Sequence, residues 1–245
     1  MVDIKQNLEG IRTRIAEAAM HAGRNPEGVR LVAVTKTFSP DVVLEAYEAG
    51  VRDFGENRVA EGIGKIKAVE QRLSGERPTW HMVGHVQSRK ASQVAQHYDY
   101  VHSVDRLKVA WRLSRYAEQA GRTIPVLLEC NVSGEASKYG FALKSWQQED
   151  ALLRAFFSDV SEILALPALE VRGLMTMPPY VEDPEEVRPL FASLRALRDA
   201  LQERFQTVDG RHLSMGMTDD FEVAVEEGAT MVRIGRGLFG PRGSQ

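Results

Sequence analysis

Val29-Arg30-Leu31-Val32-Ala33-Val34-Thr35-Lys36 is the stretch from which the fold can be inferred. Its near-continuous apolar run, rich in valine, is typical of a strand buried on both faces, as in a parallel sheet. Ser39 and Pro40 follow, and they suit the N-cap and the first position of a helix. Lys36 is therefore expected at the C-terminal end of a strand, where α/β sheets and barrels bind their ligands.

Two roles are open for Lys36. Apolar neighbours would desolvate its amine and lower its pKa, which would free it to attack a carbonyl and form a Schiff base. Alternatively, the side chain reaches past the strand end to water and has no chemical role. The stretch alone favours the second reading.

Composition excludes several classes of protein. The 245 residues suit one α/β barrel, and a net charge of −3 gives no support to a nucleic-acid or membrane partner. A single cysteine, Cys130, excludes an internal disulfide and fits a reducing compartment. The N-terminus lacks a signal-peptide core, and no apolar run approaches the roughly 20 residues of a membrane span. We expect one cytoplasmic domain over residues 1–245.

Strands and helices alternate along the whole chain. The expected strands cover residues 29–36, 52–55, 79–84, 98–102, 124–130, a run ending at 173–175, 212–214 and 230–235. Eight such units predict a closed (β/α)8 TIM barrel of the α/β class, with an extra amphipathic helix near residues 4–19. An open doubly wound sheet is the alternative, but it would normally carry a glycine-rich turn after the first strand.

Three of the helices that follow these strands have boundaries that the sequence predicts. We expect a polar helix over residues 87–97, a long one over 143–166, and one capped by Thr218 whose first turn carries Asp219, Asp220 and Glu222.

The last two units suggest an anion site. In barrels, phosphate groups often lie in the loops after strands seven and eight. Ser214 and Thr218 offer hydroxyls there, and Gly235 and Gly237 allow backbone N–H groups to approach an anion. These residues also fit ordinary turn glycines and a helix cap. Combined with a strand-end lysine, they suggest pyridoxal 5′-phosphate (PLP) as a cofactor.

Seven motifs, in order along the chain, closely resemble the pyridoxal phosphate homeostasis protein family, which is related to the N-terminal barrel of alanine racemase (PLP fold type III). The motifs are Ala33-Val34-Thr35-Lys36, Phe54-Gly55-Glu56-Asn57, Trp80-His81-Met82-Val83-Gly84-His85-Val86-Gln87, Asn131-Val132-Ser133-Gly134-Glu135, Gly173-Leu174-Met175-Thr176-Met177, Leu213-Ser214-Met215-Gly216-Met217-Thr218-Asp219-Asp220-Phe221 and Val232-Arg233-Ile234-Gly235.

The resemblance implies a role for each residue of a cofactor site. Lys36 would carry PLP as an internal aldimine. Arg233 would face the pyridine nitrogen, leave it unprotonated and so weaken the electron sink. The remaining residues would surround the ring or hold the phosphate: Asn57, His81, Met175 and Met217 around the ring, and Ser214, Thr218 and the backbone after Gly235 at the phosphate. Arg236 would also belong to the cofactor site, but it departs from the family, where a small residue is expected at this position.

A metal site is the weaker reading of one motif. His81 and His85 have the i,i+4 spacing of metal ligands on a helix. Their apolar flanks and Gly84 place them instead at the end of a strand, where the two side chains would not face one site. We expect no metal.

Three functions remain open, and the resemblance favours the first. One is a carrier that buffers and delivers PLP, with PLP-dependent apoenzymes as recipients and little or no turnover. The second is a PLP-dependent amino-acid racemase, which needs two bases. In the related racemases the second base comes from a further β-domain across a dimer. The sequence ends at Gln245 without such a domain, which favours the carrier and a monomer. The third is a Schiff-base aldolase acting through Lys36.

Overall fold

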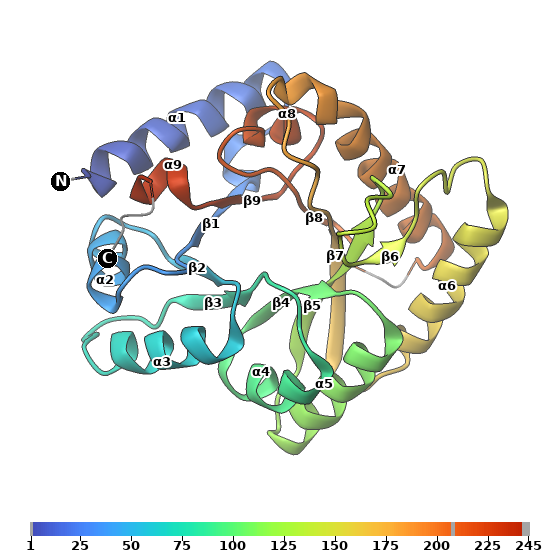
Figure 1. The fold of residues 1–245 in the computed structure, drawn as a ribbon, viewed down its shortest axis with the longest axis horizontal. Helices are drawn as coiled ribbons and strands as arrows, with labels where there is room; N and C mark the ends of the chain where they lie inside the picture. The colour runs from blue at the N-terminus through green and yellow to red at the C-terminus, as the bar shows by residue number, and fades with distance from the viewer. Residues whose placement is uncertain (1, 207–208, 242–245) are drawn as a thin grey trace.

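The computed structural model describes residues 2–206 and 209–241 and has the predicted closed barrel. Eight parallel strands form a ring in the order β4-β3-β2-β1-β9-β8-β7-β5, and a β4–β5 pairing closes it (Figure 1). This closure excludes the open sheet. The strands are β1 (Arg30–Val34), β2 (Asp53–Glu56), β3 (Thr79–Met82), β4 (Tyr100–Val104), β5 (Ile124–Asn131), β7 (Leu169–Met175), β8 (His212–Ser214) and β9 (Met231–Ile234).

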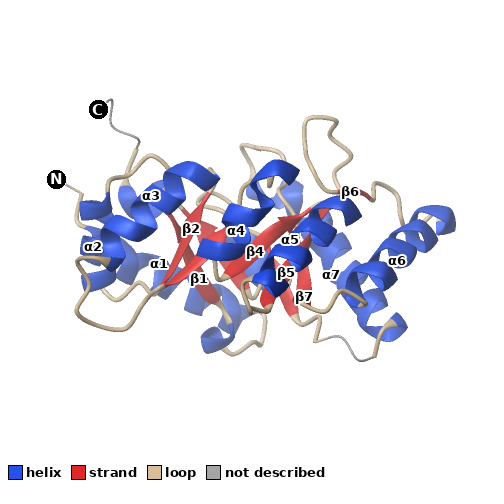
Figure 2. Cartoon of the chain, turned by 90° about the horizontal axis from the view of Figure 1, so that it is seen from below, coloured by secondary structure: helices blue, strands red, loops and turns tan. Residues whose placement is uncertain are grey.

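Helices surround the ring on the outside, as the side view also shows (Figure 2). They are α1 (Ile4–His21), α2 (Pro40–Glu48), α3 (Val59–Glu70), α4 (Ala91–His97), α5 (Leu107–Gln119), α6 (Asp150–Leu164), α7 (Arg188–Arg204), α8 (Phe221–Glu226) and α9 (Arg236–Phe239), with short 3₁₀ turns at η1 (Pro26–Gly28), η2 (Ser88–Lys90) and η3 (Pro184–Val187). The extra helix α1 packs against α8 and α9, so the first and last units of the chain meet. Among the described residues, no helix is long and apolar enough to cross a membrane.

The alternation of side chains along β1 explains how its apolar run is used. Leu31 and Ala33 face the layer of helices, whereas Val32 and Val34 pack inside the barrel with Val83. A deeper interior layer consists of Tyr100, Leu127, Met175 and Met231. The predicted two-sided burial is therefore confirmed. Because residues i, i+2 and i+4 of a strand share one face, the same alternation directs Lys36 toward the mouth of the barrel.

Three predicted boundaries are wrong. The long helix begins at Asp150, because the chain first forms a two-residue strand, β6 (Phe141–Ala142), against β5, and then passes Ser145 in a left-handed conformation (φ 62°). The polar helix over 87–97 starts as the 3₁₀ turn η2. Thr218 does not cap a helix: α8 has Asp220 at its N-cap, and the Thr218 hydroxyl instead accepts from the Gly237 N–H at 3.1 Å.

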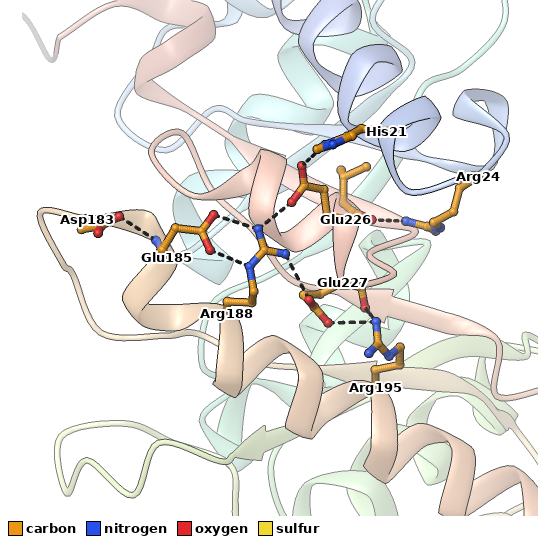
Figure 3. Close-up of polar contacts among 9 residues, drawn as sticks. His21, Arg24, Asp183, Glu185, Arg188, Arg195, Glu226 and Glu227 are labelled. Carbon is orange, nitrogen blue, oxygen red and sulfur yellow. Dashed lines mark hydrogen bonds and ion pairs between the residues drawn. The ribbon is translucent and has the colours of Figure 1, made fainter.

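A group of ion pairs ties the last helices together around Arg188 (Figure 3). Its guanidinium contacts Glu185 on η3 at 2.6 Å, Glu226 at the end of α8 at 2.6 Å, and Glu227, the C-cap of α8, at 3.1 Å. Glu226 also contacts His21 at the end of α1. These pairs hold α8, the helix that follows the loop bearing Thr218, against its neighbours.

Candidate functional site at the mouth of the barrel

A cavity of about 220 Å³ opens at the C-terminal ends of the strands. Six of the eight barrel strands or the loops after them contribute its walls, which are Val34, Lys36, Asn57, Val83, Met177, Met217, Thr218, Asp219, Arg233, Gly235 and Arg236. An adjoining cavity of about 340 Å³ shares Val34, Lys36, Gly235 and Arg236 with it. The structure thus brings together seven of the ten residues predicted to form the cofactor site.

A larger hollow of about 460 Å³ lies at the opposite end of the barrel, where Arg30 and Asp53 begin their strands. We place the functional site at the mouth instead. Ligands of barrels bind at the C-terminal strand ends, and only the mouth combines an amine, a buried guanidinium and a threonine hydroxyl with glycine backbone.

Lys36 sits in a turn that α3 holds from both sides. The Thr35 carbonyl accepts from Lys65 Nζ at 2.5 Å, and the Thr37 N–H donates to Glu61 at 2.6 Å. Thr37 has φ 70°, a left-handed conformation that a β-branched residue adopts only where its surroundings impose it. The backbone on each side of Lys36 is therefore fixed, and the half-buried side chain starts from a defined position at the cavity wall.

The support beneath this turn is an ion pair buried between β2 and α3. Glu56 is fully buried and its Oε1 lies 2.6 Å from Lys65 Nζ, while the Thr35 hydroxyl donates to the same oxygen at 2.5 Å. Burial raises the pKa of Glu56, and the neighbouring ammonium of Lys65 opposes that rise. Sequence reasoning missed Lys65, because a Glu61–Lys65 pair at i,i+4 also fits a solvated helix face.

Asn57 lines the cavity and carries a hydrogen-bond acceptor that the described residues do not use. Its Oδ1 is buried and has no hydrogen-bond partner among the described residues. A buried acceptor left unpaired is costly, so a ligand donor at this position would stabilise the loop. Gly84 explains why the loop lies where it does, because a Cβ there would come within 2.2 Å of the Asn57 carbonyl oxygen.

Arg233 forms a charged floor. Its side chain is buried inside the barrel, where Nη1 donates to Ser214 Oγ at 2.6 Å and Nη2 to the Thr176 carbonyl at 2.8 Å. Burial lowers the pKa of Arg233 to about 10, an effect that the carboxylates of Asp220 and Glu129 oppose. The guanidinium therefore stays positively charged at neutral pH.

One end of the cavity is suited to a phosphate group. Thr218 accepts from the Gly237 N–H, and Gly235 and Gly237 flank the start of the short helix α9. A Cβ at Gly237 would come within 3.0 Å of Thr218 Cγ2, so the two segments approach closely only because the residue is glycine. The exposed Arg236 side chain forms an ion pair with Asp219 at the rim of the cavity. Its charge is therefore already paired within the protein.

Three predicted site residues do not line this cavity: His81, Ser214 and Met175. His81 and Ser214 are fully buried one layer deeper, and both belong to a network around His102. Ser214 Oγ is bonded to Arg233 and His102 rather than directed at the phosphate end. Met175 also lies in the deeper layer, whereas Met177 lines the cavity.

The two histidines of the possible metal motif turn to different partners. His81 Nε2 lies 2.9 Å from Asp53 Oδ1, whereas His85 Nδ1 lies 3.1 Å from Asp105 Oδ2. No group of three or more histidine, cysteine, aspartate or glutamate residues within 2–206 and 209–241 is arranged to hold a metal ion.

Comparisons with known proteins identify the family of this chain. Residues 6–243 match the family model of the alanine racemase N-terminal domain. The chain is 44% identical over 242 residues to the pyridoxal phosphate homeostasis protein of Pseudomonas aeruginosa, covering 99% of this chain and 97% of that one. It is 40% identical over 243 residues to the protein of that name from Vibrio alginolyticus, covering 99% of both chains.

Solved structures share the fold of this chain. PipY of Synechococcus elongatus with PLP bound superposes with a TM-score of 0.81 at 34% identity, covering 97% of this chain and all of that chain. An alanine racemase of Clostridium difficile shares the fold at 15% identity, with a TM-score of 0.69, covering 99% of this chain and 57% of that one. From its sequence, its barrel and its relatives, this chain belongs to the pyridoxal phosphate homeostasis protein family, within the wider group of alanine racemase N-terminal domains.

Proposed function

We propose that this protein binds PLP at the mouth of its barrel and serves in PLP homeostasis, holding the cofactor and releasing it to PLP-dependent apoenzymes. The observation that carries the proposal is the meeting of Lys36 and Arg233 in one cavity, which Thr218 and Gly235 also line. The names of the relatives and the PLP-bound PipY structure support it.

The residues present fit the chemical groups of PLP. The aldehyde would bond to the Lys36 amine, with loss of one water, and the phosphate would lie against Thr218 and the backbone of residues 235–237. Three cationic residues, Lys36, Arg233 and Arg236, line the cavity and suit an anionic ligand, although Arg236 is paired with Asp219. The unpaired Oδ1 of Asn57 supplies an acceptor beside them.

Arg233 favours storage over turnover. A guanidinium that is charged at neutral pH only donates hydrogen bonds, so a ring nitrogen of PLP that faces it would accept a hydrogen bond and stay unprotonated. The ring then withdraws electrons less strongly than it would beside a carboxylate, so bound amino acids would gain less activation. We infer that any turnover is weak.

A racemase needs a base on each face of its substrate, and the walls of the cavity supply Lys36 as one of them. Among the described residues that line the cavity, Lys36 is the single amine, and histidine, tyrosine and cysteine are missing. The Asp219 carboxylate is paired with Arg236. As parts of the same proposal, we place the protein in the cytoplasm, acting as a monomer, with residues 1–245 as one PLP-binding domain.

Borohydride reduction followed by peptide mapping tests the proposal. The protein is incubated with PLP, reduced and analysed by mass spectrometry, and we expect one pyridoxyl-phosphate adduct on the peptide containing Lys36. Lys36→Ala should abolish it, while Lys108→Ala, an exposed residue of α5, should leave it unchanged. An unmodified Lys36 in the wild-type protein would refute the cofactor assignment and favour the aldolase reading.

A separate assay addresses turnover. The PLP-loaded protein is incubated with single enantiomers of amino acids, and the other enantiomer is measured by chiral chromatography. We expect no conversion above that of the Lys36→Ala variant with free PLP. Conversion that requires Lys36 would make the protein an enzyme.

A further inference from the structure

A continuous chain of hydrogen bonds runs through the interior of the barrel and ends at Arg233. Asp53 Oδ1 lies 2.9 Å from His81 Nε2, His81 Nδ1 lies 2.9 Å from His102 Nε2, and His102 Nδ1 lies 2.9 Å from Ser214 Oγ. Ser214 Oγ then accepts from Arg233 Nη1 at 2.6 Å. Five side chains from five different strands are linked, and they join the lower end of the barrel to the floor of the cofactor cavity.

The donors and acceptors along this chain can be assigned from its upper end. A guanidinium only donates, so Ser214 Oγ must accept from Arg233. The Ser214 hydroxyl donates its own proton to His102 Nδ1, because it has no other acceptor among the described residues. His102 must then carry its proton on Nε2 and donate to His81 Nδ1. His81 in turn carries its proton on Nε2 and donates to Asp53.

Packing leaves the middle of the chain little freedom. His81, His102 and Ser214 are fully buried. The ring of Tyr100 stacks on His81 at 5.3 Å between centroids and meets His102 edge-on at 5.1 Å. Burial lowers the pKa of His102 well below its usual value, so the ring stays neutral and keeps one acceptor nitrogen for Ser214.

At its upper end, the chain fixes the guanidinium of Arg233. Nη1 is tied to Ser214 and Nη2 to the Thr176 carbonyl, and two such bonds define the plane of the group. The remaining N–H groups are then directed by those two bonds. Removing the Ser214 bond would allow the guanidinium to rotate about its other anchor.

We propose that His102, acting through Ser214, is a positioning residue that aims Arg233 at the ring of the bound cofactor, with His81 and Asp53 holding His102 in place. This rests on the proposed binding of PLP. It assigns Ser214 to the ring end of the site, in contrast to the phosphate contact expected from its sequence position.

Binding of PLP and of pyridoxal, which lacks the phosphate, separates the two roles of Ser214. If Ser214 acts through Arg233, Ser214→Ala should weaken both ligands by the same factor, about tenfold for one lost hydrogen bond to a charged group. Thr218→Val should weaken PLP alone, because Thr218 lies at the phosphate end. A loss confined to PLP in Ser214→Ala would return Ser214 to the phosphate and overturn the proposal.

The histidine variants test positioning apart from simple packing. His102→Leu should shift the absorption maximum of the bound cofactor and weaken both ligands as Ser214→Ala does. His102→Gln, whose amide can both accept and donate, should restore part of each change. Tyr100→Phe is the matched control, since it keeps the ring that packs beside both histidines and removes only a buried hydroxyl without a partner among the described residues. Equal effects of Tyr100→Phe and His102→Leu would contradict a positioning role.

A measurement without cofactor separates failure of this proposal from failure of the proposed function. In the ligand-free wild-type protein, ¹⁵N NMR of the histidine rings should place the proton on Nε2 in both His81 and His102. A proton on Nδ1 of His102 would break the chain and overturn the proposal, whether or not PLP binds. The expected tautomers together with no adduct at Lys36 would instead refute the proposed function alone.

Discussion

Lys65 Nζ lies 2.6 Å from Glu56 Oε1 and also donates to the carbonyl of Thr35, the residue before Lys36. Both side chains of the pair are almost completely buried. An ion pair in this setting fixes geometry more than it adds stability, because both charges have lost their water. Here the geometry that it fixes is the turn from which the proposed cofactor lysine projects.

Removing the Lys65 ammonium should therefore destabilise the protein. We expect Lys65→Met to lower the free energy of unfolding by about 3–5 kcal/mol, because it leaves the Glu56 carboxylate buried without its opposite charge. The same variant should form the Lys36 adduct more slowly. Urea unfolding and the rate of adduct formation measure the two effects. Lys67→Met, exposed on the same helix, is the control and should change neither.

The stability of the protein should depend on pH through Glu129. Burial, and then the nearby Asp105, raises the pKa of Glu129 to about 7 from the 4.5 of a free carboxyl. Between these values the folded state binds more protons than the unfolded state, so the contribution is present in full below pH 4.5 and is lost as the pH rises through 7.

Glu129→Gln should remove that dependence. We expect the variant to match the wild type near pH 4.5 and to be more stable at pH 8 by about 3–4 kcal/mol, the free energy of a shift of this size. Urea unfolding at several pH values measures it. Parallel stability profiles for the two proteins would show that the Glu129 carboxyl does not titrate as described.

Gly84 should not tolerate a methyl group. A Cβ at Gly84 would lie 2.2 Å from the Asn57 carbonyl oxygen, so the loop bearing Asn57 must move. We expect Gly84→Ala to cost about 1–3 kcal/mol of stability and to weaken PLP binding. Gly64→Ala on α3 has open space and should stabilise the protein by about 0.4–1 kcal/mol. Equal behaviour of the two variants in thermal unfolding and PLP titration would contradict the contact.

The pairs around Arg188 should matter for stability but not for the site (Figure 3). Arg188→Met breaks contacts to three carboxylates and should destabilise the protein by about 1–2 kcal/mol, less at high salt. PLP affinity should stay unchanged. Arg154→Met, which breaks an exposed pair to Asp150 at 3.9 Å, should have almost no effect. A loss at Arg188 that salt does not reduce would point to packing instead of charge.

The barrel could be predicted because the signal for it is repeated in every unit. The apolar run of β1 and the run that ends at Cys130 in β5 are buried on both faces, as the sequence indicates. The segment before Asp150 was harder, because Leu143 and Trp146 are buried in a loop and so continue the apolar pattern of α6. Periodicity reports burial, and a buried loop carries the same signal as the first turn of a helix.

The sequence motifs did not reveal how far below the mouth of the barrel each site residue lies. Val83 and His81 are two residues apart on one inward face, so they belong to successive layers, and only Val83 reaches the cavity. Counting residues in steps of two from each strand end would have placed His81 below the mouth. The bond from Ser214 to His102 joins residues 112 positions apart, and no local pattern encodes it.

The two halves of the cavity come from opposite ends of the chain. Strands β1 and β9 are hydrogen-bonded neighbours, with Val32 opposite Arg233, although about 200 residues separate them in the sequence. A nascent chain that already displays Lys36 therefore has no floor for its ligand until β9 has been made and docked. Ligand capture thus requires that β9 has docked beside β1, and the binding free energy is gained only after this pairing of distant segments.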